Sequence, residues 1–378
     1  MIILNKINSK IETKGRIVKL ALGDSHSIAL SATNRFFVWG SNARGQLGDG
    51  TLIDKIVPTD ITDFFPFVSN EKIIKISAGG WHTAVLSSLN QLYIWGFNQY
   101  RQLASGNKVD SSSPVNITNN FELLENEKII DVSLGGYNSS LITSFGRVFT
   151  WGDNEFGNLG GLFQTMKQVS IDITKNFKLE AEEKLEKIYL RNNHSAAITS
   201  LKRVFTWGVN ASGQLGNGSF KIKKDPTDIT KLFNLEDHDY IISLALGDWY
   251  SFALSKKGKL FGFGNNEYCQ LGVNTFKKNI KKPLEITLYL GLFLDEKVVQ
   301  VVCGKDSTAV LTSKNRIITF GRNKFNQLGY DLKKKKGLPY DITTQFDLQD
   351  DFVASIYSGN NHFAALTVGG KILFWGKQ

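Results

Sequence analysis

The chain of 378 residues contains little cysteine, little proline and no long apolar run. Its two cysteines, Cys269 and Cys303, form no C-x-x-C pair and are too few for a disulfide framework, which fits a reducing compartment. Six prolines and 21% charged residues exclude a collagen-like or disordered chain. At this length, folding buries about three quarters of the surface, so the core needs no disulfide or metal to hold it.

Signals for export and for membrane insertion are also missing. The apolar start MIIL is followed at once by Asn and Lys, which is too short for a signal peptide. No apolar run approaches the ~18 residues that cross a bilayer. We expect a soluble monomer of the cytoplasm or nucleus, with delivery into a host cell as a further option.

Motifs for catalysis are absent as well. The sequence contains no G-x-x-x-x-G-K loop, no H-E-x-x-H and no G-x-S-x-G, and its carboxylates show no pair with spacing typical of acid–base catalysis. We therefore predict a non-enzymatic protein without catalytic residues, cofactor or metal, whose chemistry, if any, happens on a partner.

The sequence does contain a repeat of about 56 residues. An aromatic-Gly pair occurs seven times, with spacings of 56, 56, 56, 56, 57 and 55 residues. The aromatic residues of these pairs are Trp39, Trp95, Trp151, Trp207, Phe263, Phe320 and Trp375. Seven copies at a nearly fixed period indicate a repeat architecture that occupies residues 1–378 as one domain.

Each repeat is predicted to form four short strands. In the second repeat, β-rich runs over residues 73–78 and 83–86 precede a hairpin turn and a third strand that ends at Trp95. A fourth strand follows the long connection, and prolines at its start mark it in four repeats: Pro58, Pro114, Pro226 and Pro283. Four-stranded antiparallel sheets repeated radially make a β-propeller, so we predict an all-β fold with seven blades.

The two ends of the chain predict how the ring closes. Residues 16–19 stand 56 residues before residues 72–75, which places residue 2 at the register of Pro58, in a fourth strand. The chain stops three residues after Trp375, before the last repeat reaches its own fourth strand. We predict that residues 1–10 supply this strand and so cover the sheet edges.

Two further motifs recur in the same register. N-x-x-G-Q-L-G is found at 42–48 and 210–216 with variants in four other repeats, and G-x-x-H or a variant of it precedes each second strand. Together with the aromatic-Gly pair, they closely resemble the regulator of chromosome condensation repeat family across essentially the whole chain. The resemblance implies a seven-bladed propeller that binds other proteins.

Some repeats depart from these motifs. The histidine position holds Asn138, Tyr250 or Ser307 in three repeats, and the first glycine of N-x-x-G-Q-L-G is Arg101, Cys269 or Asn326 in others. Because Arg and Cys tolerate a left-handed backbone poorly, we expect the turns at Arg101 and Cys269 to differ locally.

Four of the five histidines occupy the G-x-x-H position: His26, His82, His194 and His362. We interpret them as structural residues that satisfy backbone groups near the blade turns. A ring of metal ligands is disfavoured because three of the seven positions lack histidine. The Trp of each aromatic-Gly pair is interpreted as core between blades.

The variable residues of the G-x-x-H turns are the candidate partner site. Because strands alternate in direction, these turns share one face with the long connections that follow Q-L-G. The candidates are Asp24, Trp81, Tyr137, Asp248, Trp249 and Asp306. Trp and Tyr often dominate interface energy, although these rings could instead pack against the central shaft. Resemblance to the Ran nucleotide-exchange factor implies that Asp24, Asp248 and Asp306 face a GTPase.

Lysines concentrate on the long connections of three neighbouring repeats, in a chain of net charge +10. They are Lys221, Lys223, Lys224, Lys277, Lys278, Lys281, Lys282, Lys333, Lys334, Lys335 and Lys336. They are either plain solvated loops or a basic arc that attracts an acidic partner and weakens as salt rises. Acidic connections at 122–128, 180–184, 236–239 and 347–351 predict an opposite face of unlike charge.

Three functions stay open. The leading hypothesis is a propeller that binds or regulates a small GTPase, as a Ran-type guanine-nucleotide exchange factor or a scaffold, although the near-constant period leaves no room for that factor's wedge-like insertion. One alternative is a sequence-independent binder of chromatin, nucleic acid or an acidic protein, with steep salt dependence and without aromatic residues interleaved in the lysine runs. The other is an enzyme inhibitor, as in the related propeller that inhibits β-lactamases.

Light sensing, found in a plant ultraviolet-B photoreceptor of the same family, is not expected. Only Trp81 and Trp249 stand outside the aromatic-Gly pairs, and they lie one residue out of that receptor's G-W-R-H-T register.

Overall fold

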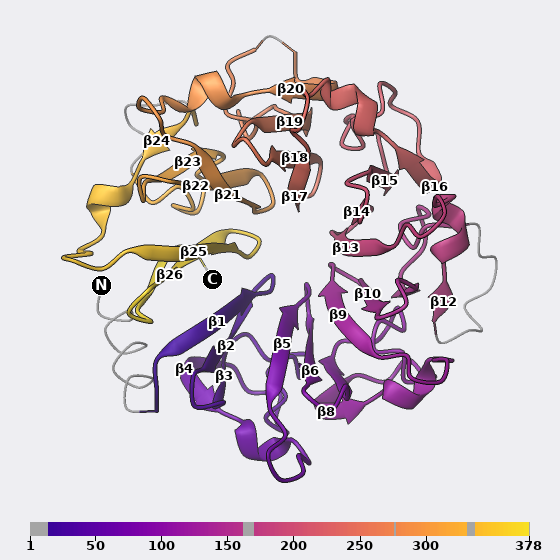
Figure 1. The fold of residues 1–378 in the computed structure, drawn as a ribbon. Coiled ribbons are helices and arrows are strands. Elements are labelled where there is room, and N and C mark those ends of the chain that lie inside the picture. Colours follow the sequence, from indigo (N-terminus) through magenta and orange to yellow (C-terminus); the bar gives the residue numbers. More distant parts are fainter. Residues whose placement is uncertain (1–13, 162–169, 276, 331–336, 378) are drawn as a thin grey trace.

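The computed structural model describes residues 14–161, 170–275, 277–330 and 337–377. These residues form seven antiparallel sheets arranged radially around a central axis (Figure 1). Six sheets have four strands and the seventh has three, counted over the described residues. The prediction of a seven-bladed β-propeller with four strands per blade is confirmed.

Blades 1 to 4 follow one another along the chain, and in each the strands pair in sequence order. Blade 1 contains β1 (Ile17–Leu22), β2 (His26–Ser31), β3 (Phe36–Gly40) and β4 (Lys55–Asp60). Blade 2 contains β5 (Ile73–Ala78), β6 (His82–Ser87), β7 (Leu92–Gly96) and β8 (Ser111–Asn116). Blade 3 contains β9 (Ile129–Leu134), β10 (Asn138–Thr143), β11 (Val148–Gly152) and β12 (Ile171–Asp172). Blade 4 contains β13 (Leu185–Leu190), β14 (His194–Thr199), β15 (Val204–Gly208) and β16 (Lys223–Asp228).

Blades 5 to 7 complete the ring. Blade 5 contains β17 (Ile241–Leu246), β18 (Tyr250–Ser255), β19 (Leu260–Asn265) and β20 (Asn279–Glu285). Blade 6 contains β21 (Val298–Cys303), β22 (Ser307–Thr312), β23 (Ile317–Gly321) and β24 (Tyr340–Asp341). Blade 7 contains β25 (Val353–Ser358), β26 (His362–Thr367) and β27 (Ile372–Gly376).

Short 3-10 helices follow the fourth strands of the first six blades. They are η1 (Thr62–Phe64), η2 (Thr118–Asn120), η3 (Thr174–Phe177), η4 (Thr230–Phe233), η5 (Thr287–Leu290) and η7 (Thr343–Gln345). In the part of the chain that the structure describes, no helix is long and apolar enough to cross a membrane.

The hydrophobic core lies between neighbouring blades. The second strand of each blade is buried along its whole length, as β6 shows, because a blade covers each of its faces. One cluster joins Ile28 and Val38 of blade 1 to Val85 and Trp95 of blade 2. Full burial of one such aliphatic side chain stabilises the fold by about 1.5–3 kcal/mol.

The ring is closed by packing between blades 7 and 1. Leu20 and Trp39 of blade 1 share a buried cluster with Ala364 and Leu366 of blade 7. In Figure 1, β25 and β1 lie beside each other at this junction. The predicted closing strand, residues 1–10, lies outside the described residues, so that part of the closure stays a prediction.

A steric requirement accounts for the glycine of each aromatic-Gly pair. Gly96 has φ 108°, and an added Cβ would lie 2.5 Å from the carbonyl oxygen of Trp81. Gly152 and Gly208 show the same geometry against Tyr137 and Asn193. Any side chain here would collide with the turn between the first and second strands, so the repeat retains glycine.

The N-x-x-G turns are uniform, so the expectation that Arg101 and Cys269 alter them was wrong. Arg101 has φ 64° and Cys269 φ 59°, close to the φ 74° of Gly45. The side chain of Asn98 fixes the turn, because its Oδ1 accepts from Leu103 N at 2.9 Å and its Nδ2 donates to Val109 O at 3.1 Å. These bonds impose the left-handed backbone even on Arg101.

The prolines do not start the fourth strands, which begin earlier than predicted. Pro58 is the fourth residue of β4 and Pro114 the fourth residue of β8. The β3–β4 register shifts between Val38 and Gly40, next to the proline. Proline is tolerated there because the fourth strand is the outer edge of its blade. The register shift also interrupts the hydrogen bonds between β3 and β4 at this point, so the missing N–H of proline costs little.

Candidate protein-binding face

Three histidines of the G-x-x-H turns, His26, His82 and His194, each link their blade to the next. His26 Nε2 lies 3.0 Å from Thr83 Oγ1 of blade 2. The Thr83 hydroxyl donates to the Gln46 carbonyl at 2.8 Å, which also accepts from Trp95 Nε1 at 3.0 Å. Because the single hydroxyl proton is used on the carbonyl, His26 must donate from Nε2. The partner is thus a side-chain hydroxyl, where a backbone group was expected.

The same chain of bonds recurs around the ring. His82 pairs with Ser139 at 2.9 Å and His194 with Ser251 at 2.9 Å. Burial lowers the pKa of His26, His82 and His194 to about 3, so all three are neutral in the folded protein. In blade 5, Tyr250 replaces the histidine and donates to Ser307 O at 2.6 Å. These groups hold the scaffold of the site.

The variable residues of these turns form a charged cluster around the axis. Arg191 Nε donates to Asp248 Oδ1 at 3.0 Å, and Arg191 Nη2 donates to Asn360 Oδ1 at 2.8 Å. Asn192 Nδ2 also donates to Asp248 Oδ1, at 3.1 Å. These bonds therefore connect blades 4, 5 and 7 at the end of the propeller that carries the G-x-x-H turns. We call this end the upper face.

The three predicted aspartates differ in availability. Asp248 is 6% exposed and its Oδ1 accepts from Arg191 and Asn192 of blade 4, so it positions Arg191 instead of facing solvent. Asp306 is 9% exposed and pairs with Arg322 at 3.2 Å. Asp24 is half-buried, and burial raises its pKa against the opposing effect of Arg191. Asp24 is the most accessible carboxylate of the three.

A small gap lies beside Asp24. It is bounded by the diglycine turns of blades 2 and 3 and by Arg191, with a volume of 30 Å³. A volume of about 30 Å³ is the share of one water molecule in the liquid. This gap is therefore too small for a ligand larger than water, and the described residues around it present a surface for contact with another macromolecule.

An exposed aromatic cluster lies on the upper face between blades 2 and 3. Tyr100 and Tyr137 have ring centroids 5.0 Å apart, and Phe97 packs edge-on against both at 6.1 and 5.9 Å. The guanidinium of Arg44 covers Phe97 at 5.1 Å from the ring centroid. Tyr100 is 39% exposed. Trp81 is half-buried, and its backbone carbonyl accepts from Phe97 N at 2.9 Å.

A second group of aromatic and cationic side chains lies across the axis. Arg322, which pairs with Asp306, stacks on Tyr268 with its guanidinium carbon 4.6 Å from the ring centroid. Lys324 lies 5.6 Å from the ring centroid of Phe325. Trp249 is 38% exposed, so it does not pack into the shaft. The upper face thus carries aromatic–cation patches on both sides of the charged cluster.

The sequence motifs did not single out an aromatic column that contributes to these patches. The third residue of the N-x-x-G motif is aromatic in four of its six copies: Tyr100, Phe156, Tyr268 and Phe325. Aligning the repeats at their period would have shown this column. The aromatic position is easily missed because the motif N-x-x-G is recognised by its Asn and Gly, and its two middle positions are treated as variable.

The basic arc is only partly described. Its seven described lysines are all exposed: Lys221, Lys223, Lys224, Lys277, Lys278, Lys281 and Lys282. Of these seven, Lys278 alone forms an ion pair with a described residue, Glu267 at 3.3 Å. Lys333, Lys334, Lys335 and Lys336 lie outside the described residues. We call the seven described lysines the lysine rim.

The acidic connections of the opposite face are partly internal. Glu183 is buried and pairs with Arg203 at 2.8 Å, and Arg203 also pairs with Asp228 at 2.9 Å. Burial acts against the charged form of Glu183, but hydrogen bonds from Thr199, Glu180 N and Arg203 hold its pKa below its usual range. Glu127 and Glu296 form the same buried pairs in blades 3 and 6. Fewer acids therefore face solvent than the sequence suggests.

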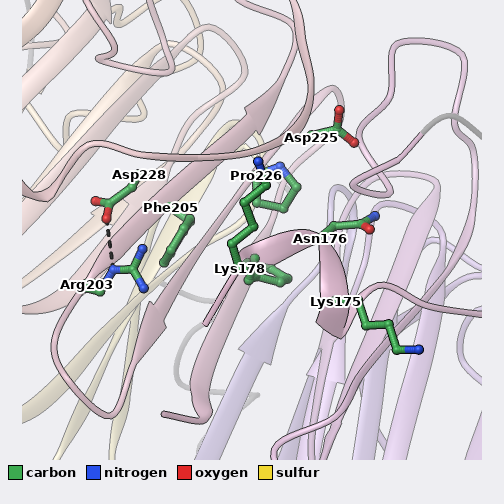
Figure 2. A pocket seen from close by; sticks show the side chains of 9 residues that line it. Lys175, Asn176, Lys178, Arg203, Phe205, Asp225, Pro226 and Asp228 are labelled. Atoms are coloured by element: carbon green, nitrogen blue, oxygen red, sulfur yellow. Dashed lines mark hydrogen bonds and ion pairs between the residues drawn. The ribbon is translucent and has the colours of Figure 1, made fainter. Parts of the chain in front are cut away.

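A pocket that borders this network lies on the outer wall between blades 3 and 4. It has a volume of 330 Å³ and is lined by η3 residues and by Asp225, Pro226 and Asp228 of β16 (Figure 2). Arg203 is committed to Asp228, Glu183 and the ring of Phe205. No predicted partner-binding residue lines this pocket, so it is separate from the upper face.

The fold and its upper face define a seven-bladed repeat propeller. The profile of the RCC1-like domain matches residues 4–289, and that of the regulator of chromosome condensation (RCC1) repeat matches residues 298–327. The chain belongs to the RCC1-like domain family, as the recurring motifs implied.

Similar proteins are found in several lineages. The ultraviolet-B receptor UVR8 of Arabidopsis thaliana is 28% identical over 86% of this chain and 69% of its own. The X-linked retinitis pigmentosa GTPase regulator homologue of Caenorhabditis elegans is 27% identical over 96% of this chain and 24% of its own. Among solved structures, human WBSCR16 has a TM-score of 0.76 at 24% identity, covering 90% of this chain and 88% of its own. Prp20p of Saccharomyces cerevisiae has a TM-score of 0.74 at 20% identity, covering 96% and 83%. At these identities the structures show the fold alone.

Proposed function

We propose that this protein is a non-enzymatic interaction propeller that binds a small GTPase on its upper face. The observation that carries the proposal is the pair of exposed aromatic–cation patches that flank the charged cluster of Asp24, Arg191 and Asp248. Trp, Tyr and Arg are the residues that most often dominate interface energy.

The rigidity of the upper face supports this proposal. Arg191 is fixed by Asp248 and Asn360, and Tyr137 by Phe97 and Tyr100. Side chains already held in place lose little freedom on binding, which favours affinity. Surface charges of both signs beside exposed rings suit a folded protein partner with matching polar and apolar areas.

The relatives support the choice of partner class. One relative that matches 96% of this chain is named a GTPase regulator homologue. Prp20p, which shares the fold, binds Gsp1p and histones. Taken with the charged axial cluster, these relatives make a small GTPase the partner class that we propose.

Binding to a panel of purified small GTPases, each in GDP-bound, GTP-analogue-bound and nucleotide-free form, tests the proposal. We expect one member to bind, and Trp249→Ser and Tyr100→Ser each to weaken its binding by about tenfold or more. Serine is the residue that blades 1 and 4 carry at these repeat positions, as Ser25 and Ser212, so both variants should fold.

Leu288→Ser is the matched control. Leu288 is an apolar residue on η5 that is 92% exposed, at the end of the molecule away from the upper face. We expect it to leave binding unchanged. Failure of every GTPase to bind, or equal losses in all three variants, would contradict the proposal.

A further inference from the structure

The lysine rim recurs at the same place on neighbouring blades. An added Cβ on Gly157 would lie 2.9 Å from the Cα of Lys224, and one on Gly213 would lie 2.8 Å from the Cα of Lys281. In blades 4 and 5 the fourth strand thus crosses the N-x-x-G turn of the preceding blade and brings a lysine there. Blades 4 and 5 therefore repeat one arrangement of positive charge along the outer rim of the upper face.

The charge of this rim is largely unneutralised. Residues 217–225 and 265–282 contain seven lysines, with Asp225 and Glu267 as their acidic residues. Only Glu267 pairs with a rim lysine among the described residues, Lys278. A surface whose charged side chains are nearly all positive and unpaired attracts a negatively charged partner.

Exposed aromatic rings are interleaved with these charges in space, although the lysine runs seemed to lack them. Phe220 is 46% exposed, and Lys281 Nζ of the next blade lies 5.7 Å from its ring centroid. Tyr268, 40% exposed, continues the series toward the axis with Arg322 on its ring. Rings and cations thus alternate along blades 4 to 6.

We propose that the lysine rim, with Phe220 and Tyr268, is a binding site for single-stranded nucleic acid. Such sites combine a basic track for the phosphates with aromatic rings on which successive bases stack. A duplex keeps its bases stacked on each other, so the two rings would add nothing to its affinity. A flexible acidic chain such as poly-glutamate would bind the lysines but has no base or ring to stack on Phe220 and Tyr268.

The repeat itself supplies substitutions that the fold accepts. Blade 2 carries Ser111, Ser112 and Ser113 in β8 where blades 4 and 5 carry rim lysines, so a Lys223→Ser/Lys224→Ser/Lys281→Ser/Lys282→Ser variant should keep the strand pairing. Blade 1 has Leu52 at the position of Phe220, and blade 4 has Ser212 at that of Tyr268. A Phe220→Leu/Tyr268→Ser variant therefore removes the rings without changing the net charge.

Fluorescence anisotropy with the full chain, at several salt concentrations, tests the site. The probes are labelled RNA and DNA single strands of about 16 nucleotides, the matching DNA duplex, and poly-glutamate. We expect both single strands to bind more tightly than the duplex. The aromatic variant should lose about tenfold in single-strand affinity with its salt slope unchanged. The lysine variant should lose about 3 from the slope of log affinity against log salt.

Preference for RNA or for DNA would identify which single strand the site takes, and either supports the proposal. Equal binding of duplex and single strand, with no effect of the aromatic variant, would overturn it in favour of a purely electrostatic surface. Tighter binding of poly-glutamate than of the oligonucleotides would overturn it in favour of an acidic protein. Absence of oligonucleotide binding at low salt, from a chain with native circular dichroism, would also overturn it.

Discussion

His26 of blade 1 donates its Nε2 proton to the hydroxyl of Thr83 in blade 2, across a heavy-atom distance of 3.0 Å. The two residues stand 57 positions apart in sequence, one repeat plus one residue. The bond therefore joins blades, and burial, which lowers the pKa of His26, keeps its imidazole neutral. Two of the equivalent histidines, His82 and His194, form the same kind of bond to a hydroxyl of the next blade, that of Ser139 and of Ser251.

We expect stability to fall as the pH drops below about 6.5. Burial lowers the pKa of His26, His82 and His194 to about 3 and that of His362 to about 4. The unfolded histidines take up protons near pH 6.5 while the folded ones do not, so each contributes a loss of about 1.4 kcal/mol per pH unit below that value. Urea unfolding at pH 5 to 7.5 measures the slope.

His194→Gln should reduce this pH slope by the share of one histidine, while Gln can still donate to Ser251. His238→Gln is the matched control, because His238 is exposed on a connection. An unchanged slope in His194→Gln would show that the buried histidines do not carry the acid sensitivity.

Arg203→Ala should destabilise the protein by about 3–5 kcal/mol. The variant leaves the carboxylate of Glu183 buried without its cation, since Glu183 is 0% exposed in the ion pair and Arg203 is 22% exposed. It also removes the partner of Asp228. Urea unfolding at neutral pH measures the loss.

Two further variants test whether the buried charge causes the loss of stability in Arg203→Ala. Lys257→Ala breaks an exposed pair with Glu236, whose side chain is 61% exposed, and should leave the midpoint of urea unfolding nearly unchanged. Arg203→Ala/Glu183→Gln should recover part of the loss because it removes the buried charge. If Arg203→Ala and Lys257→Ala proved equally mild, the network would not be a source of stability.

The fold could be predicted from the sequence because the motif at Trp39 and its copies recurs at a nearly constant interval. The site could be predicted only in part. Asp248 was singled out as a contact residue, but its Oδ1 accepts from Arg191, which lies one blade away at the glycine position of the G-x-x-H motif. Tyr100 joins Tyr137 across two different motifs, so neither motif alone reveals the pair. Glu183 was counted as surface charge because Arg203, its partner, stands twenty residues later.

Arg101→Gly should stabilise the protein by about 1 kcal/mol. Arg101 holds a left-handed backbone at φ 64°, which costs a side chain energy that glycine avoids. Its buried Nε has no hydrogen-bond partner among the described residues, so little is lost with the side chain. The midpoint of urea unfolding should rise.

The reverse change in blade 1 is the comparison for Arg101→Gly. Gly45→Arg should destabilise, because an added Cβ would lie 2.6 Å from the Cα of Ser112 in a turn at φ 74°. A lower unfolding midpoint for Arg101→Gly would mean that the arginine makes a contact that outweighs its backbone strain.

Asp24→Ala separates binding of a GTPase from action on its nucleotide. Asp24 is the most accessible carboxylate of the charged cluster, and it lies beside the diglycine turns of blades 2 and 3, where an added Cβ on Gly80 would lie 3.2 Å from its Oδ2. If the protein accelerates nucleotide release from the GTPase it binds, we expect Asp24→Ala to lower that rate about tenfold or more. Asp248→Ala is a poorer probe because it releases Arg191 and so alters the fold of the upper face. Release of a fluorescent GDP analogue measures the rate. Binding without acceleration, unaffected by Asp24→Ala, would assign the propeller to scaffolding and would remove Asp24 from the contact surface.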